Sequence, residues 1–223
     1  MSCNPQRSFT VKEGVFMVIT DIREANAGRS ERKKAYRIFI DDKFAFLIYE
    51  DEMEQFNLSV GTEITPDVYE TIEDFVLKRA RHKALNIIKY SDKTEKEICL
   101  RLKEEYYTDD IIEKAIEYLK IYNYLNDERY AENYVRSRKN KESRFSIESK
   151  LQSKGINKGV LEKIIAGEYE INDEDSDPEI LAINKIIQKK CDNPTNLSYT
   201  DKMKLINLLK RKGFNSDKIN KCL

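Results

Sequence analysis

The chain has 223 residues, of which 36% are charged and 40% hydrophobic, and its 40 basic and 40 acidic side chains cancel at neutral pH. One histidine, His82, and four cysteines without a C-x-x-C spacing exclude a multi-histidine metal site and give no signal of a zinc ribbon or redox pair. No stretch approaches roughly 18 continuous apolar residues, so we expect a cytoplasmic protein with free thiols and no membrane partner.

Residues 1–65 have the composition of a small β unit. Apolar residues alternate or cluster in three short segments, 16–22, 36–40 and 44–49, which predict three strands. Asp41-Asp42 separates the last two segments and is expected to form a tight turn. This antiparallel unit is too small to hold much of a core alone.

From Pro66 onward the apolar residues recur with a period near 3.6, which predicts helices, with Thr65 as the cap of the first. The most informative feature is a repeat. Further apolar residues lie at +4, +9, +14 and +18 after Ile98, Ile147 and Leu205 alike. The copies begin 49 and 58 residues apart, so we interpret them as one small helical unit copied in tandem.

Each copy is expected to contain three helices, because a leading helix precedes the repeated pair at 66–90, 127–140 and 179–191. Gly155 and Gly213 occupy the same place in the second and third copies, where a left-handed backbone would end a helix. The predicted fold class is therefore mostly α: three tandem three-helix repeats in an elongated, curved array, preceded by a small N-terminal antiparallel β unit.

The predicted division of the chain follows these patterns and the charge. Residues 167–182 carry seven acidic and no basic side chains, which is typical of a solvated linker. The resulting division is a β unit at 1–65, repeat 1 at 66–125, repeat 2 at 126–166, an acidic linker with the start of the next helix at 167–182, and repeat 3 at 183–223.

Basic side chains gather in the second and third repeats. Residues 126–166 carry ten basic and six acidic side chains, and residues 183–223 carry ten and three. Such clusters are either solvated helix faces or a surface for a polyanion or an acidic protein. The second-repeat cluster also lies beside a helix expected to start near Ser146, whose N-terminus is a natural phosphate site. The candidate residues are Arg136, Arg138, Lys139, Lys141, Arg144, Lys150, Lys154, Lys210, Arg211 and Lys212.

No pattern points to catalysis. The chain lacks the glycine-rich loops that bind nucleotides, and no nucleophile can be matched with a base. The paired carboxylates Asp41-Asp42 and Asp109-Asp110 are better explained as a hairpin turn and a helix cap, and the acidic run 173–175 as part of the linker. We therefore expect a protein that is not an enzyme, with no catalytic residue, metal or cofactor.

Two segments of the second repeat resemble the RecX family of bacterial regulators of the RecA recombinase. The first is the run Leu125-Asn126-Asp127-Glu128-Arg129-Tyr130-Ala131, and the second is the step Lys154-Gly155-Ile156. The resemblance covers about residues 15–223 and fits the three-helix repeats found above. The chain departs from the family pattern at Lys89-Tyr90-Ser91-Asp92, and at Ser143, where members often have glycine.

The resemblance implies a non-enzymatic modulator, most often an inhibitor, that binds RecA filaments on single-stranded DNA. It would limit filament growth, ATP hydrolysis and strand exchange, and so act in DNA repair, homologous recombination and the SOS response. The partners implied are the RecA filament and, as an open alternative, single-stranded DNA directly, with the chain itself as a monomer. Arg129 is either a cap or ion-pair residue, or a further contact to the partner.

Two other functions stay open at this point. The basic repeats could belong to a general nucleic-acid-binding protein, which would show a steep salt dependence without any effect on a recombinase. A helical scaffold for another protein is the third possibility, although the copies are not spaced by the 34 residues of tetratricopeptide repeats.

Overall fold

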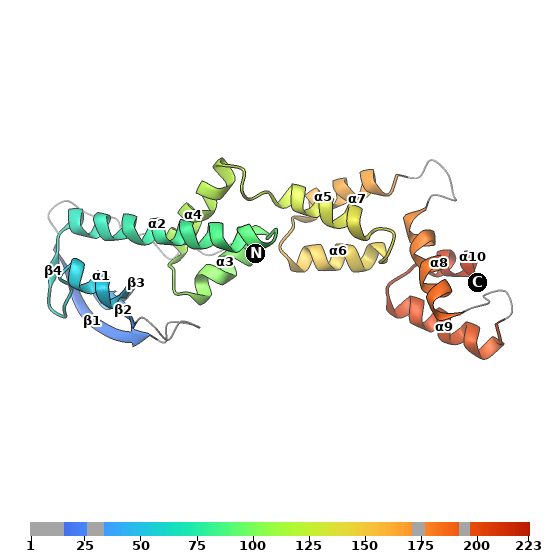
Figure 1. The fold of residues 1–223 in the computed structure, drawn as a ribbon, viewed down its shortest axis with the longest axis horizontal. Helices are drawn as coiled ribbons and strands as arrows, with labels where there is room; N and C mark the ends of the chain where they lie inside the picture. Colours follow the sequence, from blue (N-terminus) through green and yellow to red (C-terminus); the bar gives the residue numbers. More distant parts are fainter. Residues whose placement is uncertain (1–15, 26–33, 171–176, 192–196) are drawn as a thin grey trace. The chain divides into compact units, whose positions relative to one another are not determined.

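A four-stranded antiparallel sheet opens the chain, with the strand order β3-β2-β1-β4. The computed structural model describes residues 16–25, 34–170, 177–191 and 197–223 (Figure 1). The three predicted strands are confirmed. The fourth strand, β4, was not predicted, because a strand of two residues is too short to show alternation of apolar and polar residues. The strands are β1 (Met17–Ala25), β2 (Ala35–Ile40), β3 (Lys43–Tyr49) and β4 (Glu63–Ile64).

The predicted turn between β2 and β3 is confirmed. Asp41 and Asp42 both have positive φ, at 47° and 63°, and Ile40 pairs with Lys43 across them. Two consecutive left-handed residues form the two-residue hairpin turn whose twist matches that of the strands. Aspartate tolerates this conformation better than most residues do.

The first of two compact units comprises residues 1–125, and its described part contains four helices besides the sheet. The Thr65 hydroxyl accepts a bond from the Val68 N–H, which confirms the predicted cap. The prediction that Asp109-Asp110 caps a helix was wrong, because the cap position is Thr108. Both carboxylates lie in the first turn instead, where the helix dipole favours negative charge. The helices are α1 (Glu50–Gln55), α2 (Pro66–Tyr90), α3 (Glu95–Glu104) and α4 (Asp109–Ile121).

The sheet shares its main core with the helices. Ile19 and Ile38 belong to the same buried cluster as Ile72 and Ile98, which agrees with a β unit too small to hold a core alone. Arg79 of α2 strengthens the junction. Its guanidinium donates to the Glu52 carboxylate and to the Leu47 carbonyl, and lies 4.8 Å from the centre of the Tyr49 ring.

The second compact unit comprises residues 126–223 and contains two further three-helix groups. Their leading helices, α5 (Asp127–Arg138) and α8 (Pro178–Lys190), confirm the predicted positions within two residues. Each group has its own buried cluster, one around Leu151 and one around Leu209. The helices are α5 (Asp127–Arg138), α6 (Arg144–Ser153), α7 (Lys158–Glu168), α8 (Pro178–Lys190), α9 (Tyr199–Arg211) and α10 (Ser216–Cys222).

The repeat is confirmed position by position. Every apolar residue at the repeated spacing is buried, except Tyr107 and Leu223, which are half-buried. Gly155 and Gly213 have φ values of 94° and 83°, as a left-handed helix end requires. The equivalent residue of the first copy is Tyr106, which adopts the same conformation at φ 62° without being glycine. The chain is thus mostly helical, with a small N-terminal antiparallel sheet, whereas the five-part division at 65, 125, 166 and 182 stays a prediction.

Candidate functional site

Two cations at the end of α5 share one carboxylate of α7. Arg136 and Lys139 lie 3.0 and 2.8 Å from the Glu168 carboxylate, and Lys139 also donates to the Glu168 carbonyl at 3.0 Å. The carboxylate side chain is only 18% exposed. These contacts hold α5 against α7, and the group of three keeps one surplus positive charge.

A second carboxylate is shared in the same way. Arg138 and Lys150 lie 2.9 and 2.6 Å from Glu142, which follows α5 in the chain. Burial raises the pKa of Glu142. The hydrogen bond and charge of Lys150, together with the charge of Arg138, lower the pKa by more than burial raises it, so the pKa lies below the ordinary value. Arg144 pairs with Glu148 one turn along α6, at 2.7 Å. Intramolecular pairing therefore accounts for much of the predicted second-repeat cluster.

Acid is expected to weaken the contact between α5 and α7. The hydrogen bond from Lys139, with that from Arg136, lowers the pKa of Glu168 below its ordinary 4.5. The pKa of Glu168 is lower in the folded protein than in the unfolded chain. Its ion pairs therefore contribute fully to stability above pH 4.5, and this contribution is lost as the pH falls through the pKa of the folded protein. Glu168→Gln should cost about 1 kcal/mol of unfolding free energy at neutral pH, and nothing well below that range.

Urea denaturation at a series of pH values measures this difference. Glu162→Gln is the matched control, since Glu162 lies on the same helix, is 66% exposed and faces Lys158 only at 3.8 Å. A cost for Glu168→Gln that does not shrink in acid would contradict the assignment.

Other predicted residues are placed around this cluster. Lys154 lies over the Tyr130 ring, 5.5 Å from its centre, and Tyr130 stacks on Tyr134 in the second-repeat core. Arg129 has an exposed side chain, and its N–H donates to the side chain of Asn126, the cap of α5. Within the described part of the chain, four predicted cations are exposed and have no side-chain partner: Lys141, Lys210, Arg211 and Lys212.

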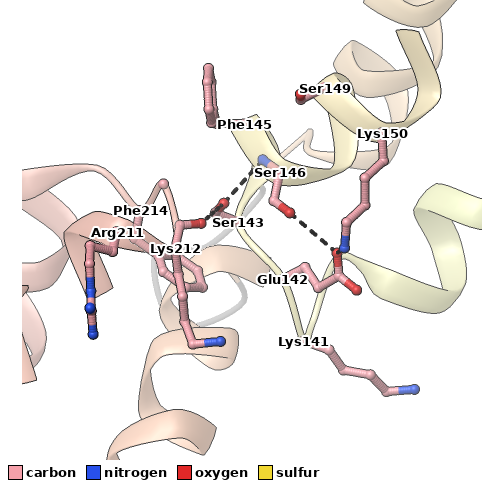
Figure 2. A pocket seen from close by; sticks show the side chains of 11 residues that line it. Lys141, Glu142, Ser143, Phe145, Ser146, Ser149, Lys150, Arg211, Lys212 and Phe214 are labelled. Carbon is pink, nitrogen blue, oxygen red and sulfur yellow. Dashed lines mark hydrogen bonds and ion pairs between the residues drawn. The ribbon is translucent and has the colours of Figure 1, made fainter. Parts of the chain in front are cut away.

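Three of these unpaired cations line one open cavity of about 410 Å³ between the second and third repeats (Figure 2). One wall is the α5–α6 connection with the first turns of α6, and the other is the end of α9 with the start of the following loop. We call this cavity the α6–α9 groove. Its lining residues are Lys141, Glu142, Ser143, Phe145, Ser146, Ser149 and Lys150 on one side, and Arg211, Lys212, Gly213 and Phe214 on the other.

Ser143 joins the two walls. It is buried, with 1% of its surface exposed. Its hydroxyl accepts from the Ser146 N–H at 3.2 Å, which caps α6, and donates to the Lys212 carbonyl at 2.6 Å, which closes the end of α9 (Figure 2). One side chain therefore ends one helix and begins another.

The N-terminus of α6 already holds one carboxylate of this chain. The helix begins at Arg144, earlier than expected, and the Arg144 N–H donates to the carboxylate of Glu179 at 2.9 Å. A buried carboxylate from α8 thus occupies one N–H group of this helix start, and the phosphate site there stays a prediction. Arg144 and Glu179 are 35 residues apart in the sequence, so no local pattern could reveal the contact.

The groove also contains residues that the sequence analysis did not single out. Phe145 is 67% exposed although it is a large apolar residue, and Ser146 and Ser149 place hydroxyls one turn apart on α6. The sequence shows Phe145 only as one more aromatic residue, and its exposure becomes visible only in the fold. Among the residues that the structure describes, no group of His, Cys, Asp and Glu side chains could hold a metal ion, and no helix is long and apolar enough to cross a membrane.

Comparisons with known proteins agree on one family. Residues 80–119 match the family model described as RecX, first three-helix domain, and residues 126–164 match RecX, second three-helix domain. The regulatory protein RecX of Clostridium acetobutylicum is 31% identical over 79% of this chain and 81% of that protein. The regulatory protein RecX of Clostridium perfringens strain SM101 is 34% identical over 82% of this chain and 85% of that protein.

Solved structures resemble the fold. A crystal structure of regulatory protein RecX has a TM-score of 0.58 at 23% identity and covers 92% of this chain and 98% of its own. The crystal structure of RecX from Lactobacillus salivarius has a TM-score of 0.54 at 26% identity, over 66% of this chain and 93% of its own. The mostly helical architecture with a small sheet therefore agrees with known relatives.

Proposed function

The chain belongs to the RecX family of regulatory proteins, and from this membership we propose that it binds RecA filaments assembled on single-stranded DNA and limits their growth, ATP hydrolysis and strand exchange. The observation that carries the proposal is the identity with RecX proteins over most of both chains. Inhibition, rather than stabilisation of the filament, is the sign that we propose. The protein acts in the cytoplasm, as a monomer and without catalysis.

The contact surface that we propose consists of the basic residues of the second and third repeats. Four of them, Lys141, Lys210, Arg211 and Lys212, have no side-chain partner within the described residues and are exposed, so their charge is available to an acidic surface. Two cations share each of the carboxylates of Glu142 and Glu168, so one positive charge is left over at each. The full proposed set is Arg129, Arg136, Arg138, Lys139, Lys141, Arg144, Lys150, Lys154, Lys210, Arg211 and Lys212.

The test is the single-stranded-DNA-dependent ATPase rate of the cognate RecA, titrated with this protein. Inhibition at substoichiometric ratios is expected if the protein blocks or destabilises filament ends, and inhibition only near saturation if it coats the filament. Changing Lys141, Lys210, Arg211 and Lys212 to Gln should raise the concentration needed by at least about tenfold. An ATPase rate that a folded protein leaves unchanged would sink the proposal.

Two further variants make this experiment specific. Lys78, Lys89 and Lys163 are exposed and have no side-chain partner within the described residues, so their change to Gln is a control for loss of charge alone. Changing Arg136, Arg138, Lys139 and Lys141 to Ala should also weaken inhibition. That variant leaves Glu168 without a cation and Glu142 with Lys150 alone, so its folding must be compared by circular dichroism.

A general nucleic-acid-binding function is the second candidate, and the composition of the α6–α9 groove favours it. It predicts DNA binding with a steep salt dependence but no effect on RecA.

A further inference from the structure

The α6–α9 groove has an excess of positive charge that no other described residue of the second unit neutralises. Its charged lining consists of four cations, Lys141, Lys150, Arg211 and Lys212, and one carboxylate, Glu142. Lys150 is held by that carboxylate at 2.6 Å, and Arg138 adds a second cation to it. The three other cations are exposed and have no side-chain partner among the described residues. They come from two different repeats, so only the folded unit brings them together.

An exposed aromatic ring lies in the same groove. Phe145 is 67% exposed, and Figure 2 shows its ring standing clear of α6. The ring is close to the opposite wall, because a Cβ atom built on Gly213 would lie 2.8 Å from the Phe145 Cδ1 atom. The glycine thus leaves room for the ring, which keeps its place at the mouth of the groove while offering apolar surface to a ligand.

Hydroxyl groups complete the lining. Ser149 is exposed on α6, one turn after Ser146. Neither hydroxyl makes a short hydrogen bond to a described residue, since that of Ser146 reaches the Glu142 carboxylate only at 3.5 Å. Serine hydroxyls and lysine or arginine side chains are the donors that proteins commonly use for phosphate oxygens. The lining therefore combines donors for phosphate with a flat apolar ring.

This combination distinguishes between ligands. An acidic protein surface would use the cations but has no need of an open phenyl ring, and duplex DNA keeps its bases stacked away from such a ring. A single strand offers both phosphates and unpaired bases, and stacking on aromatic side chains with cations along the backbone is how proteins bind single strands. The groove is also open rather than enclosed, which suits a ligand that enters and leaves it.

We propose that the α6–α9 groove binds single-stranded nucleic acid directly, with Lys141, Arg211 and Lys212 on backbone phosphates and Phe145 stacked on one base. The inference rests on the proposed function for its ligand, the DNA strand of the filament, but it needs no recombinase to be tested.

The experiment is fluorescence anisotropy with a labelled oligothymidine strand and with an abasic strand of the same length, in the absence of RecA. Phe145→Ala should weaken oligothymidine binding by about 5- to 100-fold and leave binding of the abasic strand unchanged, because only the base is lost from the contact. Phe145→Tyr keeps the aromatic face and should restore most of the affinity. Circular dichroism shows whether each variant is folded.

The phosphate contacts are tested by salt. Changing Lys141, Arg211 and Lys212 to Gln should reduce the slope of log affinity against log salt by about 2, whereas the Lys78, Lys89 and Lys163 control should keep it. Equal affinity for the abasic strand and oligothymidine, or for duplex and single strand, would overturn the inference, as would unchanged affinity in Phe145→Ala. No strand binding alongside intact inhibition of the RecA ATPase would overturn it while leaving the proposed function standing.

Discussion

Lys218→Met is expected to lower the free energy of unfolding of the second unit by about 2–4 kcal/mol. The Lys218 ammonium lies 2.8 Å from Asp177 and 2.9 Å from Glu179, whose side chains are both 7% exposed. Without the lysine, two buried carboxylates would face each other with no cation between them. The estimate lies below that for a fully buried pair because the lysine is 27% exposed.

The measurement is urea denaturation followed by circular dichroism at neutral pH. Burial lowers the pKa of Lys218, but its bonds to Asp177 and Glu179 outweigh this and raise the pKa above 10.5. The contribution is therefore complete below that value and is lost only as the pH rises through the folded pKa. A measurement at neutral pH therefore includes the full contribution of Lys218 to stability.

A neutral version of the cluster separates charge from packing. Adding Asp177→Asn and Glu179→Gln to Lys218→Met should recover most of the loss, because no unpaired charge then remains buried. Lys185→Met is the control on the exposed side of α8 and should change stability by less than about 0.5 kcal/mol. If Lys218→Met costs no more than Lys185→Met, the cluster does not stabilise the unit.

Gly213→Ala is expected to cost about 2–5 kcal/mol. Its φ of 83° is left-handed, which an alanine adopts at about 1–2 kcal/mol, and overpacking adds a further cost of about 1–3 kcal/mol. The new Cβ would lie 2.8 Å from Phe145 Cδ1 and 3.1 Å from the Ser143 hydroxyl. The exposed ring can move aside, but the buried hydroxyl holds the Lys212 carbonyl and cannot move without breaking that bond.

Two other glycines serve as matched controls. Gly61 has a similar φ of 86° but nothing within 4 Å of the added atom, so Gly61→Ala measures the backbone strain alone. Gly167, near the end of α7, has open space and no positive φ, and its change to Ala should be neutral or stabilising by up to about 1 kcal/mol. If Gly213→Ala lowers the free energy of unfolding by no more than Gly61→Ala does, the added Cβ atom does not collide with Phe145 and Ser143. Adding Phe145→Ala should relieve the part of the cost that comes from the ring.

Local patterns were sufficient to predict most of the fold. The apolar spacing after Ile147 and Leu205 predicted buried helix faces, because a packed three-helix unit needs the same positions filled in every copy. Gly155 and Gly213 marked helix ends through their freedom at positive φ. Tyr106 shows the limit of this signal. It adopts the same left-handed conformation at φ 62°, but a tyrosine in the sequence does not predict a positive φ.

The candidate site was only partly predictable. The basic residues were visible as clusters, but the carboxylates that neutralise them were not, because Glu168 meets Lys139 across 29 residues and two helices. The same holds for the groove, where Lys141 and Lys212 become neighbours through the Ser143 contact, which spans 69 residues. Pairing at such separations depends on tertiary packing, which a sequence pattern does not record.

Arg79 has a consequence for the protein during its synthesis. Strand β3 lies at the edge of the sheet and is almost wholly apolar from Phe44 to Tyr49, the kind of edge that pairs with other chains. In the finished fold, α2 packs on this strand and Arg79 bonds the Leu47 carbonyl. Since domains begin to fold while the ribosome is still adding residues, the strand emerges more than thirty residues before its guanidinium partner. The nascent chain is therefore most prone to aggregation in that interval, when β3 has emerged and the helix that covers it has not.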